Sequence, residues 1–116
     1  MALALTLKEQ NYILECDREL EPQLQTTFKL KPLSAKVFSE LQDLLKIETH
    51  GERIANIGSY THQVLMYGLV GWDNLKDEND NVVVFTTNKE DNLDKLSPLF
   101  RSELANAILE MSSLKN

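Results

Sequence analysis

The chain has 116 residues and a mass of 13.3 kDa, which is the size of one domain. Twelve Lys and Arg against 18 Asp and Glu give a net charge of −6 and an isoelectric point of about 4.8, so binding to nucleic acid or to a membrane is disfavoured. The single cysteine, Cys16, cannot form an intrachain disulfide, and the N-terminal residues lack the pattern of a signal peptide. We therefore expect one cytoplasmic domain over residues 1–116, with 1–10 as a flexible or edge segment.

The first part of the chain predicts two antiparallel strands followed by a helix. Residues 11–16 are rich in strand formers, and residues 26–33 alternate apolar and cationic side chains with the period of a half-buried strand. Pro32 is expected to end the second strand, because proline has no N–H to donate to a ladder. Ser34 matches a helix N-cap, and the apolar residues after it predict an amphipathic helix over 35–47.

The middle of the chain predicts two separate helical segments. Residues 52–58 favour a short helical turn that stops at a glycine, and Ser59 is expected to cap a second helix over 60–70. Gly68 lies inside that helix, where it costs about 1 kcal/mol relative to alanine and allows a neighbouring element to approach closely. Residues 71–72 are expected to close the helix.

The remaining residues predict a polar loop, a strand and two helices. The loop, 73–81, carries four acidic side chains. The later elements are expected over 82–85, 88–95 and 98–113. Thr87 and Glu90 match a capping box for the first of the two helices, and Ser97 with Pro98 starts the second. Together these elements predict a single α+β domain in which a small antiparallel strand pair or sheet packs with three to four amphipathic helices.

Nothing in the sequence predicts a catalytic, cofactor-binding or metal site. The chain carries no P-loop, dinucleotide-binding or Gly-x-Ser-x-Gly motif. His50 and His62 are scattered, and Cys16 is expected to be a small apolar residue of the first strand. Residues 77–81 begin like a calcium loop, but a valine stands where the loop needs glycine, and an asparagine stands where it needs glutamate. A solvated hairpin loop is the favoured interpretation.

Two segments resemble a known protein family. Residues 71–78 read GWDNLKDE, directly after a predicted helix, and residues 103–112 read ELANAILEMS within the last helix. The strand and the Pro-Leu-Ser helix entry within 26–38 add to the pattern. It resembles the tail assembly chaperones of long-tailed bacteriophages, although Asn79, Asp80 and Asn81 stand where that pattern has a glycine in the turn.

The resemblance implies a non-enzymatic role in virion morphogenesis, in the host cytoplasm. Such proteins coat the long helical tape measure protein until tail tube proteins polymerise around it, so the implied partners are the tape measure protein and also the tail tube protein. The chain could also form a homo-oligomer. Candidate partner contacts, chosen because they are large, adaptable or terminal, are Tyr67, Trp72, Met111 and Leu114. Trp72 has a second interpretation, as a cap on the core below the acidic loop.

Other functional classes stay open. A structural head–tail connector or tail completion subunit would remain in the virion, whereas a chaperone would leave. A small acidic binding module would instead occupy a basic site on a host protein. An enzyme would need a buried, polar, concave site, for which the sequence offers no recognisable residues.

Overall fold

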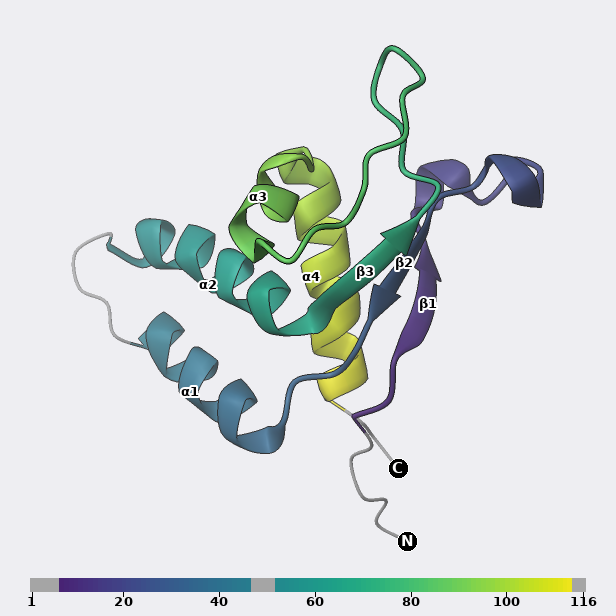
Figure 1. Cartoon of the computed structure of the whole chain (residues 1–116). Helices are drawn as coiled ribbons and strands as arrows, with labels where there is room; N and C mark the ends of the chain where they lie inside the picture. The colour runs from purple at the N-terminus through teal and green to yellow at the C-terminus, as the bar shows by residue number, and fades with distance from the viewer. Residues whose placement is uncertain (1–6, 47–51, 114–116) are drawn as a thin grey trace, which may run out of the picture.

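The computed structural model describes residues 7–46 and 52–113, with side chains described for 7–43 and 58–113. Within these ranges, four α-helices gather on one side of a three-stranded antiparallel sheet (Figure 1). The expected α+β class is therefore confirmed. The elements in chain order are β1 (Gln10–Ile13), η1 (Glu15–Asp17), η2 (Pro22–Leu24), β2 (Thr27–Leu30), α1 (Ala35–Lys46), α2 (Glu52–Gly68), β3 (Leu69–Asp73), α3 (Lys89–Asp94) and α4 (Pro98–Ser112).

The sheet has β2 at its centre, paired with β1 on one side and with β3 on the other. The predicted alternation of β2 is confirmed, because Phe28 and Leu30 are fully buried while Lys29 lies on the opposite face, where its Nζ is 3.4 Å from Asp73 Oδ2. One face of the sheet therefore carries the core and the other carries charged side chains.

The structure confirms that Ser34 and Ser97 cap α1 and α4, as predicted. The Ser34 hydroxyl accepts a hydrogen bond from Val37 N at 3.2 Å, and the Ser97 hydroxyl accepts one from Phe100 N at 3.3 Å. The third start is displaced by one residue: the side chain of Asn88, not of Thr87, caps α3 by accepting from the backbone N–H of Asp91. An asparagine directly after a threonine offers the same capping chemistry, so the sequence pattern alone did not separate them.

The predicted break in the middle helix was wrong. Gly58 and Ser59 lie inside α2, which runs without interruption from Glu52 to Gly68. The surroundings of Gly58 are open, and the helix continues through it because α2 packs against both α1 and α4. Burial of its apolar face outweighs the low helix propensity of one glycine.

The predicted end of that helix was also wrong. Leu69 and Val70 were expected to be helical, but they begin β3, which the sequence did not predict at all. Gly68, the last helical residue, packs directly against α4: a Cβ atom there would lie 2.6 Å from Ile108 Cδ1. The expected close approach at Gly68 is therefore confirmed, and it occurs where the chain turns from α2 into the sheet.

Two predicted strands differ from the structure. The first ends at Ile13, so Cys16 lies in the exposed turn η1 and is not a strand residue. Residues 82–85 do not join the sheet; they form only an isolated bridge, Lys76 to Val82. This extended segment instead forms one arm of a hairpin, residues 74–86, which projects from the sheet beside α3 and the start of α4 (Figure 1).

Candidate functional site

The hairpin 74–86 is fixed to the body of the protein at its first residue. Asn74 adopts a left-handed backbone conformation with φ of 62°, which suits asparagine better than most residues. Its Nδ2 donates to the backbone carbonyls of Gln23 and Gln25, each at 3.1 Å, and its own carbonyl accepts from the Thr26 hydroxyl. The chain therefore leaves β3 in a direction set by side-chain hydrogen bonds.

The tip of the hairpin is closed by Asp77. Its Oδ1 accepts hydrogen bonds from the backbone N–H groups of Asn79 and Asn81, each at 2.9 Å, and these bonds hold the pKa of the carboxyl below its ordinary value. Asp80 has a positive φ of 63°, and its Oδ1 lies 3.5 Å from Lys76 Nζ. The segment that begins like a calcium loop is thus an exposed hairpin turn, as favoured from the sequence.

Trp72 anchors the returning arm of the hairpin. The indole is only 6% exposed, and its Nε1 donates to the carbonyl of Val83 at 2.8 Å. It makes edge-on contacts with the rings of Phe28 and Phe85, with centroids 6.1 Å and 4.8 Å away. Trp72 therefore joins the sheet, the core and the hairpin, which agrees with its interpretation as a core cap and removes it from the exposed surface.

A buried asparagine fixes the end of the hairpin. Asn92 of α3 is 1% exposed; its Oδ1 accepts from the backbone N–H and the hydroxyl of Thr86, and its Nδ2 donates to the Thr86 carbonyl. Both backbone groups of Thr86 are thereby satisfied, as they would be in a sheet. This clamp holds the returning arm against α3.

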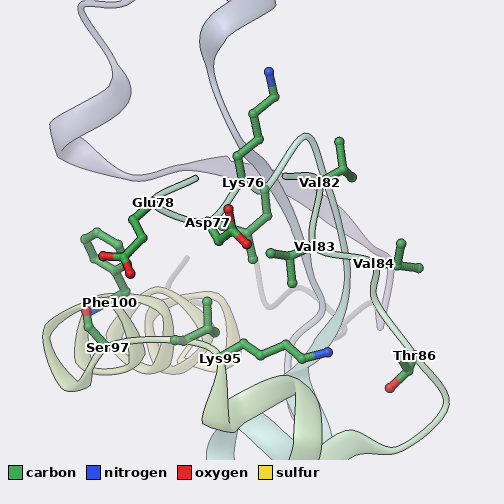
Figure 2. Close-up of a pocket in the computed structure, with 12 residues that line it drawn as sticks. Lys76, Asp77, Glu78, Val82, Val83, Val84, Thr86, Lys95, Ser97 and Phe100 are labelled. Atoms are coloured by element: carbon green, nitrogen blue, oxygen red, sulfur yellow. The ribbon is translucent and has the colours of Figure 1, made fainter. Parts of the chain in front are cut away.

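An open groove of about 890 Å³ lies between the hairpin and the corner where α3 meets α4 (Figure 2). Apolar side chains line much of it, with charged side chains among them. Val82 and Val84 contribute to the lining and are nevertheless 64% and 66% exposed. The lining residues are Leu75, Lys76, Asp77, Glu78, Val82, Val83, Val84, Thr86, Lys95, Leu96, Ser97 and Phe100. The volume is within the range of ligand pockets, but the open shape suits a peptide or helix better than a small molecule.

The expected contact residues do not meet at this groove. Tyr67 is exposed at the end of α2 and lines a separate pocket of about 160 Å³ with Leu7 and Val37. Met111 is partly buried against the core from α4, and Leu114 lies outside the described residues. The sequence reasoning missed Val82 and Val84. The available signal was the apolar run directly after an acidic loop, which was interpreted as a strand of the sheet.

The remaining singled-out side chains form no site in the part of the chain that the structure describes. His62 is half-buried with its Nε2 3.8 Å from Glu90 Oε1, and His50 lies outside the described residues. Desolvation and the neighbouring Asp17 raise the pKa of the exposed Cys16 thiol, which disfavours the reactive thiolate. Across residues 7–46 and 52–113, no group of three or more His, Cys, Asp or Glu side chains is placed to hold a metal ion.

Comparison with known proteins adds no family assignment. No protein-family model, no curated protein and no solved structure matches the chain. Among the described helices, none is both long enough and apolar enough to cross a membrane.

Proposed function

We propose that the protein is a non-enzymatic morphogenesis factor of a long-tailed bacteriophage, a tail assembly chaperone that binds and shields the tape measure protein. The observation that carries the proposal is the groove beneath the hairpin 74–86, because exposed apolar side chains on an ordered support are what a chaperone for amphipathic helices needs. The sequence resemblance at residues 71–78 and 103–112 supports the same assignment.

The groove suits an amphipathic helix that presents its apolar stripe. Val83, Leu96 and Phe100 are the more buried apolar side chains of the lining, while Val82 and Val84 on the hairpin arm are more exposed. A helix laid across these side chains would remove apolar surface from water on both partners. One small groove gives a modest affinity for each site, so many copies would coat a long helix and could later be displaced by tube subunits.

The charge of the protein supports a coating role. A net charge of −6 on each copy would keep a coated, otherwise adhesive helix in solution. The same charge opposes direct association between bound copies, which would favour spaced binding along the partner over aggregation.

The test is co-expression with the tape measure protein of the same genome, followed by pull-down and light scattering. We expect a soluble complex that forms only when this protein is present. Val84→Asp should weaken the complex, because it places a carboxylate at the rim of the groove, at a side chain too exposed to matter for folding. Leu24→Asp is the matched control, since Leu24 is similarly exposed on η2 and lies outside the groove.

Two results would contradict the proposal. If the tape measure protein stays insoluble and this protein assembles by itself into ring-sized particles found in purified virions, the protein is a connector or tail completion subunit. If Val84→Asp and Leu24→Asp bind equally well to the tape measure protein, the groove is not the binding site.

A further inference from the structure

The charged side chains of the groove are not distributed evenly. Figure 2 shows the Glu78 carboxylate beside Phe100, with Asp77 between Glu78 and Val83, whereas the ammonium group of Lys95 extends toward the side of Val84 and Thr86. Apolar side chains occupy the space between these two ends. The groove therefore has an anionic end, an apolar middle and a cationic end.

The fourth charged lining residue does not cancel this polarity. Lys76 Nζ lies 3.5 Å from Asp80 Oδ1 within the hairpin itself, and its side chain points away from the other lining residues (Figure 2). Asp77 is an exposed carboxylate and is ionised at neutral pH, and the hydrogen bonds that it accepts lower its pKa further. Glu78 makes no hydrogen bond that the turn depends on, so its charge is available to an occupant.

A second copy of the chain is a poor occupant for electrostatic reasons. Residues 73–95, which build the hairpin, α3 and the groove between them, carry seven acidic and three basic side chains, a net charge of −4 out of the total of −6. Two copies joined through this region would bring like charges together, which costs binding energy. A partner with charges complementary to both ends of the groove avoids that cost.

We propose that the groove selects an amphipathic helix with one cationic and one anionic end and fixes its direction, with the cationic end at Asp77 and Glu78 and the anionic end at Lys95. This inference deepens the proposed function and rests on it, because it concerns the partner of the same groove. A fixed direction would let successive copies lie in one orientation along a long helix. Charged ends set orientation and selectivity, while the apolar middle provides most of the contact area.

The test uses three synthetic 18-residue helical peptides that share one leucine stripe. One carries Glu in its first turn and Lys in its last turn, one carries Lys at both ends, and one carries Glu at both ends. We expect the first peptide to bind roughly 3- to 10-fold more tightly than either of the others, as measured by fluorescence anisotropy at low salt. The difference should shrink as salt is added, because the charges are exposed.

Charge reversals on the protein sharpen this test. Glu78→Lys should weaken the binding of the two peptides that have a Lys end and strengthen the binding of the all-Glu peptide. Lys95→Glu should strengthen the binding of the all-Lys peptide and weaken the binding of the all-Glu peptide. Glu40→Lys and Lys36→Glu on the exposed face of α1 are matched controls that should leave the order unchanged. An unchanged order in the groove variants would overturn the inference, as would a failure of all three peptides to bind.

The direction is checked by disulfide cross-linking. Asn79→Cys places a thiol at the hairpin tip, in a Cys16→Ser background that removes the natural thiol. A cysteine added at the Lys end of the first peptide should cross-link, and one added at its Glu end should not. Equal cross-linking of both ends would refute a fixed direction, even if tape measure co-expression succeeds. If the peptides bind selectively but co-expression gives no complex, the tape measure protein is not the partner, and the inferred selectivity of the groove is unaffected.

Discussion

Apolar packing holds the sheet against α4, whereas the hairpin 74–86 is held by side-chain hydrogen bonds as well as by apolar contacts such as that of Phe85 with Trp72. In the first region, Phe28, Leu104 and Ile108 are fully buried. In the second, Asn74, Asp77 and Asn92 make side-chain hydrogen bonds to backbone groups, while two valines remain exposed. Because side-chain hydrogen bonds add to the packing of Leu75, Val83 and Phe85, the hairpin keeps its shape while Val82 and Val84 remain free for a partner. This difference explains why the groove, and not the core, is the candidate site.

The largest expected effect is on the core. Phe28→Ala should lower the free energy of unfolding by about 3–5 kcal/mol, because it removes a fully buried ring that contacts Trp72. Val84→Ala in the hairpin should change it by less than about 0.5 kcal/mol, since that side chain is largely exposed. Urea unfolding followed by circular dichroism checks both, and a similar loss in the two variants would remove the distinction between the regions.

A second comparison uses two glycines of α2. Gly68→Ala should destabilise the protein by about 1–3 kcal/mol, because its Cβ would lie 2.6 Å from the side chain of Ile108. Gly58→Ala should instead stabilise by up to about 1 kcal/mol, since Gly58 has open space around it and alanine is the better helix former. Thermal unfolding measures both changes.

The cause at Gly68 can be isolated with a double variant. Combining Gly68→Ala with Ile108→Ala should cost clearly less than the sum of the two single changes, because the second substitution removes the atoms that the first one meets. Strict additivity would show that Gly68 matters for a reason other than this contact.

The hairpin clamp should be sensitive to one buried amide. Asn92→Ala should cost about 1–3 kcal/mol, because it removes a buried amide together with its hydrogen bonds to the N–H and the carbonyl of Thr86. The same variant should weaken binding of the proposed tape measure partner, since the returning arm would lose its attachment to α3. Urea unfolding with Trp72 fluorescence gives the first quantity, and Asn106→Ala, at an exposed position of α4, is the control.

A further effect is expected at high pH. Desolvation and the hydrogen bond from the Tyr12 hydroxyl to Glu103, at 2.7 Å, raise the pKa of Tyr12 to about 12, from an ordinary value of 10.0. Because the folded-state pKa is the higher one, this stabilising contribution is complete below pH 10 and disappears as the pH rises toward 12. Absorbance of tyrosinate near 295 nm follows the titration. Tyr12→Phe should remove this late step, and a late step that survives in the variant would assign it to another tyrosine.

Local sequence patterns were reliable where a few neighbouring residues decide the structure. The caps at Ser34 and Ser97 and the alternation of Phe28, Lys29 and Leu30 could be predicted, because each depends on side chains within one turn or one strand. The candidate site was harder to predict from the sequence. Tyr67 and Trp72 were selected for their size, but size does not show whether a side chain is exposed, and Trp72 is buried beneath the hairpin.

The sequence by itself determined the α+β class, the helix starts at Ser34 and Ser97 and the acidic turn, since composition, capping and periodicity act over short distances. Only the tertiary structure decided that residues 69–73 form a strand and that residues 82–85 leave the sheet. The pairing of β3 depends on β2, about 40 residues earlier in the chain, and the hairpin arm depends on Trp72 and Asn92. These contacts join residues that are far apart in the sequence, so local propensity does not predict them.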